Sequence, residues 1–195
     1  MMNAPLGITL RKPYNTDMKK LVVFSDLHGD IDMLRMIIAR SEKEDAAFIL
    51  CAGDLGIHHS TIIAHMIRTC PIPFMTVRGN CDSPWAFIDV QMPVPPIYLS
   101  VDFCSRKILI THGDRIPSWN DAPEKLSIND IFIYGHSHVG MLKHSAHTPY
   151  ILNPGSASRP RDEHEPSFAV ITEKDISIRE IISGRIIHGF LKELR

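Results

Sequence analysis

Short apolar runs alternate with amphipathic stretches along the first half of the chain. Residues 21–24 and 48–52 are continuously apolar, as expected of strands buried on both faces of a parallel sheet, and residues 74–77 form a third predicted strand. Between them, residues 30–41 and 61–69 carry apolar side chains at helical spacing. Asp30 suits a helix N-cap, and Pro71 stops the second helix. This pattern predicts repeated strand and helix units that build a parallel sheet with helices on its faces.

The second half of the chain has a different hydrophobic pattern, which predicts mainly short strands. After the prolines at 93, 95 and 96 we expect a short helix near Pro123 to Leu126, a turn at Asn153-Pro154-Gly155, and either a strand or a helix after Ser183-Gly184. The predicted strands cover residues 98–103, 107–111, 131–134, 141–144, 150–152, 167–172 and 176–181. They predict a second sheet packed on the first.

The first 17 residues contain Pro5, Gly7 and Pro13 and show no sustained periodicity, so we interpret residues 1–17 as an N-terminal arm and residues 18–195 as a single domain. Met18 directly precedes the first predicted strand, which suggests it as an alternative translation start. Mass spectrometry of the native protein tests this hypothesis, and a peptide spanning residues 10–20 would contradict it.

Composition narrows the function classes. Lys plus Arg (21) nearly balances Asp plus Glu (22), so a formal charge of -1 provides no basic field for a nucleic-acid backbone. The four cysteines lie far apart with no Cys-x-x-Cys pair and no secretory leader is recognisable, which indicates reduced thiols in the cytoplasm. The apolar runs are far shorter than the roughly 20 residues of a membrane helix.

Side chains that commonly bind metals follow five of the predicted strands. They are Asp26 and His28 after the first, Asp54 after the second, Asn80 after the third, His112 after residues 107–111, and His136 with His138 after residues 131–134. Ligands of such sheets sit beyond the carboxyl ends of the strands, so these groups are expected to converge. Oxygen and imidazole donors suit Mn, Fe, Zn, Co or Mg. Seven donors exceed the needs of one ion and fit two ions about 3.5–4 Å apart that share a carboxylate.

Each motif has an ordinary structural interpretation. An Asp-x-His pair is most often a capping Asp beside a surface histidine, and Gly53-Asp54 is commonly a turn. Gly135-His136-Ser137-His138 is more specific, because alternating histidines in a tight turn favour a metal. The ordered set of five strand ends is therefore the main indication of a metal site.

These motifs also resemble those of a known family. Asp26-Leu27-His28, Gly53-Asp54, Gly79-Asn80-Cys81-Asp82, Thr111-His112-Gly113 and Gly135-His136-Ser137-His138 match the calcineurin-like metallophosphoesterases in order and approximate spacing, from residue 19 to about 181. The compact length and the Asn153-Pro154-Gly155-Ser156 turn resemble the small YfcE-like phosphodiesterase branch. The resemblance implies an α/β fold, a four-layer αββα sandwich of two mixed β-sheets flanked by helices.

The resemblance further implies how the donors are shared between two ions. One ion would be held by Asp26, His28, Asp54 and His138, and the other by Asp54, Asn80, His112 and His136. Asp54 would bridge, and a hydroxide between the ions would attack the phosphorus of a phosphodiester in line, without a phospho-enzyme. Asp54, Asn80, His112 and His136 would be the catalytic group. Mn²⁺ is the expected metal, with Zn, Fe, Co, Ni or Mg as alternatives.

Cys81 departs from many relatives, which have histidine there to contact phosphate and protonate the leaving oxygen. A thiol with a pKa of about 8.5 is a poor substitute. Either His58, His59 or Asp82 serves as the acid, or the substrate has a leaving group that needs little help. We hypothesise that Cys81 is not essential, which a Cys81→Ala loss approaching that of Asp54→Asn would refute.

Asn80, Arg78 and Cys81 are expected to contact a small phosphate-ester substrate, whereas Arg159 and Arg161 are expected at the surface. The choice of substrate is expected to depend on surface loops such as Pro84 to Pro96 and Arg115 to Asn120. A phosphomonoesterase on the same site is one alternative. A scaffold or interaction protein of the same fold is another, because a retromer subunit resembles this fold, although such scaffolds depart at metal-motif positions. The sequence gives no membrane or strong nucleic-acid signal, and an exposed sheet edge makes a homo-oligomer plausible.

Overall fold

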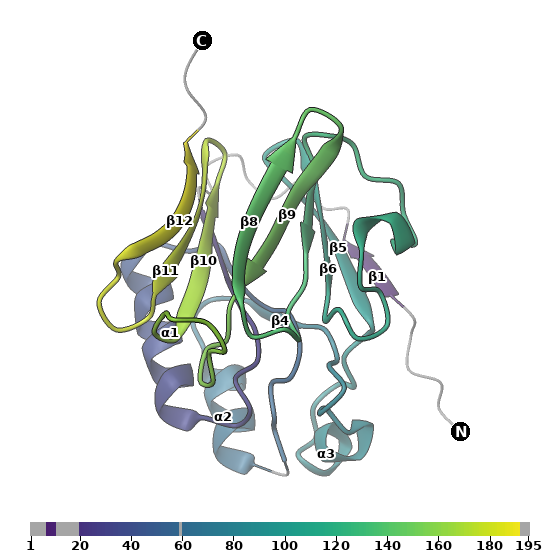
Figure 1. The fold of residues 1–195 in the computed structure, drawn as a ribbon. Helices are drawn as coiled ribbons and strands as arrows, with labels where there is room; N and C mark the ends of the chain where they lie inside the picture. Colours follow the sequence, from purple (N-terminus) through teal and green to yellow (C-terminus); the bar gives the residue numbers. More distant parts are fainter. Residues whose placement is uncertain (1–6, 11–19, 59, 192–195) are drawn as a thin grey trace.

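The computed structural model describes residues 7–10, 20–58 and 60–191 and shows two mixed six-stranded sheets packed face to face (Figure 1). The first sheet has the order β1 (Gly7–Leu10), β5 (Tyr98–Phe103), β6 (Arg106–Thr111), β7 (Ile131–Ile133), β9 (Thr148–Pro154) and β8 (Gly140–Ser145). The second has the order β12 (Ile186–Leu191), β11 (Asp175–Glu180), β10 (Ser167–Thr172), β2 (Lys20–Phe24), β3 (Phe48–Cys51) and β4 (Phe74–Thr76). This arrangement confirms the expected α/β sandwich of two mixed sheets.

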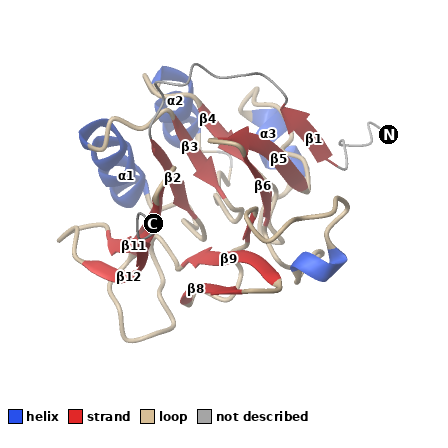
Figure 2. Ribbon diagram, turned by 90° about the horizontal axis from the view of Figure 1, so that it is seen from above, coloured by secondary structure: helices blue, strands red, loops and turns tan. Residues whose placement is uncertain are grey.

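Helices α1 (Ile31–Lys43) and α2 (Thr61–Thr69) pack on the outer side of the second sheet, and α3 (Pro84–Asp89) lies at the lower edge of the sandwich in Figure 1, with Ala86 and Phe87 in the same apolar cluster. A 3-10 turn, η1 (Trp119–Asp121), lies in the loop between β6 and β7, and Figure 2 shows it beyond β9, away from the three α-helices. None of the helices in the described residues is long and apolar enough to cross a membrane.

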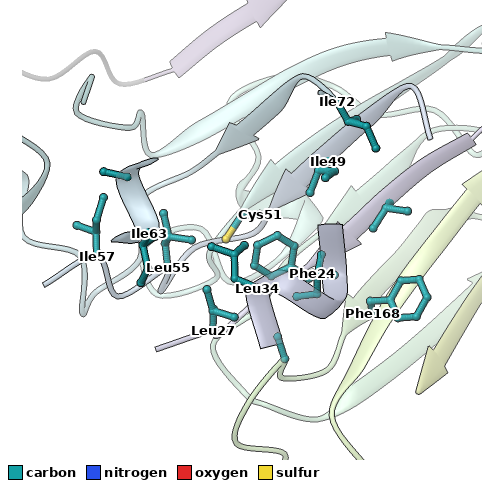
Figure 3. Packing of buried hydrophobic residues seen from close by; sticks show 14 of the residues in the cluster. Phe24, Leu27, Leu34, Ile49, Cys51, Leu55, Ile57, Ile63, Ile72 and Phe168 are labelled. Atoms are coloured by element: carbon teal, nitrogen blue, oxygen red, sulfur yellow. The ribbon is translucent and has the colours of Figure 1, made fainter. Parts of the chain in front are cut away.

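The central strands of the second sheet are buried on both faces, which explains their uninterrupted apolar sequence. Successive side chains of β2 point to opposite sides: Val22 and Phe24 join the cluster under the helices, and Leu21 and Val23 join the cluster between the sheets. Figure 3 shows the helix-side cluster, where Leu34 of α1 lies beside Phe24. The two clusters fix β2 and its parallel neighbours in the middle of the molecule.

Local capping explains where the first two helices begin. Asp30 has extended backbone angles, and its side chain accepts a hydrogen bond from Met33 N at 3.0 Å, as the sequence predicted. Ser60 caps α2 in the same way, with Oγ 3.3 Å from Ile63 N. Both helices therefore start directly after the loops that follow β2 and β3.

Two local predictions are wrong. The helix expected at Pro123 to Leu126 does not form, and the helical turn lies a few residues earlier, at η1. Glu124 instead reaches across to β6 and the neighbouring β5, where its carboxylate lies 2.7 Å from Lys107 Nζ and 3.3 Å from Ser100 Oγ. The stretch from Pro84 to Pro96, expected as a surface loop, begins with α3, because Ala86 and Phe87 are buried in the helix-side cluster.

The two ends of the chain resolve other open alternatives. The segment after Ser183-Gly184 is a strand, β12, which pairs with β11. Within the expected N-terminal arm, residues 7–10 form β1, which pairs in parallel with β5. The remainder of that arm, and Met18 with it, lies outside the described residues.

Candidate metal centre

The predicted ligands converge because the strands that precede them run parallel. β2, β3 and β4 are mutually parallel, as are β6 and β7, so the loops after them meet at one edge of the sandwich. Backbone hydrogen bonds tie these loops together: Asp26 N donates to Gly53 O at 3.0 Å, and His28 N donates to Asp54 O at 3.0 Å. On the other sheet, Gly135 N donates to His112 O at 2.9 Å.

Five of the seven predicted ligands adopt left-handed backbone angles that non-glycine residues seldom adopt. Their φ values are 55° for Asp26, 48° for His28, 50° for Asp54, 65° for His136 and 62° for His138. Such conformations cost roughly 1–3 kcal/mol each and persist only where the surrounding structure holds them, which is common at functional sites. The concentration of this strain at the strand ends indicates that the side-chain positions matter more than local stability.

Two glycines allow the loops to approach this closely. A Cβ on Gly79 would lie 2.8 Å from Asp54 Cγ and still closer to Asp54 Oδ1 and N. A Cβ on Gly135 would lie 2.9 Å from Asp26 Oδ2 and closer still to Ser25 Oγ. Any side chain at either position would therefore push a central carboxylate away.

Asp26, His28 and His138 form one half of the site. The two histidine Nε2 atoms are 3.1 Å apart, and Asp26 Oδ1 lies 3.3 Å from His138 Nε2 and 4.0 Å from His28 Nε2. Asp54 Oδ2 is 3.9 Å from His28 Nε2. Asp26, His28 and His138 thus offer ligand atoms within 4.8 Å of one another, and Asp54 adjoins this group through His28.

The other half contains Asp54, His112, Asn80 and His136. His112 Nε2 lies 3.4 Å from Asp54 Oδ2 and 3.1 Å from Asn80 Oδ1, and His136 Nδ1 lies 3.0 Å from the same amide oxygen. Asp54 Oδ2 thus faces both halves, while its Oδ1 accepts a hydrogen bond from Cys81 N at 2.8 Å. The structure brings all seven predicted residues together, and Asp54 stands between the two groups.

Hydrogen bonds on the far side of two rings orient their free nitrogens. His112 Nδ1 lies 2.9 Å from Ala52 O, and His138 Nδ1 lies 2.7 Å from Arg159 O. A carbonyl can only accept, so each Nδ1 carries the proton and each Nε2 presents a lone pair to the site when the ring is neutral. This is the arrangement that metal-binding histidines require.

The two buried carboxylates differ in pKa. Burial disfavours the ionised form of both. For Asp54, His112 outweighs burial and lowers the pKa well below its usual range, whereas for Asp26 burial raises the pKa despite the nearby histidines. Burial opposes a charged His112 as well, yet the Asp54 carboxylate outweighs it and raises the pKa of His112 to about 9. For His28, burial is the largest influence and lowers the pKa. Without a bound ion, the Asp54 carboxylate therefore stabilises a protonated His112, whereas His28 favours the neutral imidazole.

A divalent ion fits these residues. Asp26 Oδ1 is buried and lacks a hydrogen-bond partner among the described residues, although its other oxygen accepts from His136 N at 3.1 Å. A buried carboxylate oxygen without a partner is costly, and it faces the Nε2 atoms of His28 and His138. Candidate ligand groups within 4.8 Å of one another include Asp26, His28 and His138, and also Asp26, Asp54 and His112. Cation binding satisfies all of these donors at once.

Several residues that support the ligands were not assigned this role from the sequence. Ser156 Oγ and Ser158 Oγ donate to the carbonyl of Asp26 at 2.8 and 3.1 Å. Asn153 Nδ2 donates to Gly135 O at 2.8 Å and lies 3.0 Å from Ser137 Oγ, which holds the loop with His136 and His138. The Asn153-Pro154-Gly155-Ser156 motif signalled a turn, but only the tertiary structure shows what it anchors.

Asp82 is also structural. It is buried, and its carboxylate accepts three backbone hydrogen bonds, from Gly56 at 2.9 Å, Gly79 at 3.0 Å and Leu55 at 3.2 Å. Burial raises its pKa in spite of these donors. Because both oxygens bind the loops after β3 and β4, Asp82 positions Asp54 and Asn80 and is not free to protonate a leaving group.

The other residues considered from the sequence lie around the rim. His58 is exposed, as expected of a surface residue, while His59 lies outside the described residues. Arg78 is half-buried, with Asp114 and Arg115 in its electrostatic environment. Arg159 is exposed, as expected, and its charge helps to lower the pKa of His28.

Arg161 is exposed too, but its backbone N donates to His138 O at 3.0 Å. Asn80, Cys81 and His136 are also exposed, whereas Asp26, Asp54, His112 and His138 are buried. The centre therefore has exposed residues at Asn80, Cys81 and His136, and His28 is partly exposed.

Comparison with known proteins agrees with this geometry. The chain is 23% identical over 185 residues to phosphodiesterase YfcE of Escherichia coli K12, covering 87% of this chain and 96% of that protein. It is 29% identical over 159 residues to the probable metallophosphoesterase YsnB of Bacillus subtilis, covering 78% and 83%. The solved structure of Yfce, described as a phosphoesterase from E. coli, superposes with a TM-score of 0.77 at 21% identity, covering 89% of this chain and 100% of that one.

The same fold also occurs in vacuolar protein sorting 29 from Cryptosporidium parvum, with a TM-score of 0.61 and 20% identity, covering 89% of this chain and 98% of that one. Residues 18–175 match the model of the calcineurin-like phosphoesterase superfamily domain. That range contains all seven predicted ligands. The chain therefore belongs to the calcineurin-like phosphoesterase superfamily.

Proposed function

We propose that this protein is a dinuclear metal-dependent phosphodiesterase that hydrolyses a small phosphodiester. Its domain would comprise residues 18–195, with residues 1–17 as an arm. One ion is assigned to Asp26, His28, Asp54 and His138, and the other to Asp54, Asn80, His112 and His136. The observation that carries the proposal is the buried, unpartnered Asp26 Oδ1 facing two imidazole nitrogens, next to a carboxylate shared by both halves.

Ions bound at these residues supply Lewis acidity, which activates water and neutralises the phosphate oxygens. The chain contributes a rigid frame. Asp54 is held through Cys81 N, and the rings of His112 and His138 are oriented by carbonyls. We assign the exposed Asn80 and Cys81 to contact with the substrate, and the half-buried Arg78 to its outer part. We add Arg159, whose charge acts on His28.

The leaving group must depart with little protonation from this chain. Burial and the Asp54 carboxylate raise the pKa of Cys81 to about 11, so the thiol is protonated near neutral pH but is a poor proton donor. Asp82 is occupied by three backbone donors. We therefore propose diesters with a stable leaving alcohol or phenol as the preferred substrates.

Metal identity and setting complete the proposal. Mn²⁺ fits a centre of carboxylate, amide and imidazole donors, and the named relatives are phosphodiesterases or metallophosphoesterases. All four cysteines are unpaired, which supports a reducing compartment such as the cytoplasm. The substrate is the expected partner, without a membrane or nucleic acid, and the sheet edges leave room for a homo-oligomer.

The test is a metal-reconstitution assay. Metal-stripped protein is assayed with bis(p-nitrophenyl) phosphate and with p-nitrophenyl phosphate, each with Mn²⁺, Mg²⁺, Zn²⁺ or no metal. We expect metal-dependent turnover of the diester that disappears in Asp54→Asn and persists in Asp102→Asn, a matched change at an exposed aspartate on β5.

Other results would redirect the proposal. A preference for the monoester would make the protein a phosphomonoesterase on the same site. Bound ions without turnover of either ester would favour a scaffold role, in line with the fold shared with vacuolar protein sorting 29. Failure to bind divalent ions would contradict the proposal, because the proposed reaction depends on bound metal.

A further inference from the structure

Cys81 lies within reach of the metal centre. Its thiol belongs to a group with His28 and Asp54 whose ligand atoms all lie within 4.8 Å of one another. His28 Nε2 and Asp54 Oδ2, which are also members of the first ligand set, are 3.9 Å apart. A sulfur donor therefore stands beside an ion position that otherwise has only oxygen and nitrogen donors.

These spacings fit coordination. Zinc binds nitrogen and oxygen at about 2.0–2.2 Å and thiolate sulfur at about 2.3 Å, so two ligands of one tetrahedral ion lie roughly 3.4–3.8 Å apart. An independent observation points to a cation at the same place: Asp26 Oδ1, buried and unpartnered, lies 4.0 Å from His28 Nε2. Because the three ligand atoms lie within 4.8 Å of one another, a movement of up to about 1 Å brings the sulfur to this spacing.

The backbone fixes Cys81 relative to Asp54. Cys81 N donates to Asp54 Oδ1 at 2.8 Å, and Gly79 permits this close approach of the two loops. Cys81 is exposed, with Sγ 3.4 Å from Asn80 Nδ2, and its thiol also interacts with the Asp54 carboxylate. The sulfur is therefore already directed toward one of the proposed ligands.

We propose that Cys81 is a further metal ligand, at the position shared by His28 and Asp54, that binds thiophilic divalent ions such as Co²⁺, Zn²⁺ or Cd²⁺ as a thiolate. On binding, the S–H bond breaks, the proton passes to solvent and a metal–sulfur bond forms, with no change of oxidation state. Harder ions such as Mn²⁺ and Mg²⁺ prefer oxygen and leave the thiol protonated. Cys81 would thus select which metal the centre retains. This inference rests on the proposed dinuclear centre.

The experiment uses cobalt-substituted protein, because thiolate-to-cobalt charge transfer reports the metal–sulfur bond directly. Metal-stripped full-length wild type, Cys81→Ser and Cys104→Ser are titrated with Co²⁺, and bound cobalt is counted by atomic emission. Cys104→Ser is the matched control, because Cys104 lies in the turn between β5 and β6, outside the centre. We expect the near-ultraviolet charge-transfer band in wild type and Cys104→Ser, and its loss in Cys81→Ser.

A chelator competition gives a second readout. We expect the affinity for Cd²⁺ to fall by about 10–100-fold in Cys81→Ser, with a much smaller change for Mn²⁺. Circular dichroism and thermal unfolding check that the variant is folded.

The outcomes separate this inference from the proposed function. Wild type that binds cobalt and hydrolyses the diester but shows no charge-transfer band would overturn the role of Cys81 and leave the phosphodiesterase proposal intact. A band that survives in Cys81→Ser would overturn it as well. Wild type that binds no cobalt would remove both proposals together.

Discussion

Gly79→Ala tests whether the close approach of two loops holds the bridging carboxylate. The new Cβ would lie 2.8 Å from Asp54 Cγ and closer to Asp54 Oδ1 and the Asp54 backbone N. Ordinary contacts between such atoms are about 3.5–4.0 Å, so the loops after β3 and β4 must separate by about 1 Å. Because the backbone of Asp54 blocks the new atom as well as its side chain, a change of rotamer cannot relieve the clash.

The magnitude follows from two contributions. Overpacking costs about 1–3 kcal/mol, and weakening the bond from Cys81 N to the Asp54 carboxylate costs about 1.5–3 kcal/mol. We expect the free energy of unfolding to fall by about 3–5 kcal/mol and Tm by about 6–20 °C. Metal ligands tolerate displacements of only about 0.2 Å, so binding of both ions should be lost as well.

The measurements are urea unfolding and a Mn²⁺ titration of wild type, Gly79→Ala and Gly140→Ala. Gly140→Ala is the matched control, because its Cβ would meet nothing closer than Asp162 Oδ2 at 3.6 Å and its φ is not in the left-handed region. We expect this control to change stability by no more than about 1 kcal/mol. Equal stability and equal metal affinity in the two variants would refute the reasoning.

Four further outcomes are expected. Glu44 pairs with Lys20 and Arg179, and these two cations outweigh burial and lower the pKa of Glu44. The ion pairs therefore stabilise the protein above the ordinary pKa of 4.5, and this stabilisation is lost as the pH falls below that value. Glu44→Gln should flatten acid unfolding curves between pH 5 and 3 by about 1–2 kcal/mol, and an unchanged slope would contradict this. Mn²⁺ at about 100 times its Kd should stabilise the metal-stripped protein by about 2.7 kcal/mol per site, visible as a higher Tm that EDTA reverses, whereas an unchanged Tm would argue against binding to the folded state. Asn153→Ala removes the hydrogen bonds that hold the loop with His136 and His138, and one within its own turn. The free energy of unfolding in urea should fall by about 2–4 kcal/mol, and metal binding should weaken. A loss of stability with normal metal affinity would limit the role of Asn153 to folding. Cys81→Ala, assayed with Mn²⁺ and the diester, should lose less activity than the about 10²–10⁴-fold that a general acid contributes, and a loss in that range would make the thiol essential.

The sequence alone predicted most strands, the first two helices and the seven candidate ligands that the fold brings together. Apolar runs without polar interruptions identify β2 and β3 because each is buried on both faces, and the helical spacing after Asp30 is confirmed together with its cap. Ligand-competent residues directly after parallel strands converge for a geometric reason, because the carboxyl ends of such strands share one edge. Local pattern and topology therefore predicted which residues meet.

The tertiary structure decided what local pattern cannot encode. The helix expected at Pro123 to Leu126 is replaced by an irregular segment because Glu124 reaches Lys107 and Ser100 on other strands, and α3 forms because the fold buries Phe87. Likewise, the left-handed angles of the ligand residues and the unpartnered oxygen of Asp26 exist only because distant loops hold them in place. Contacts between residues far apart in sequence set these features, so they emerge only when the chain is folded.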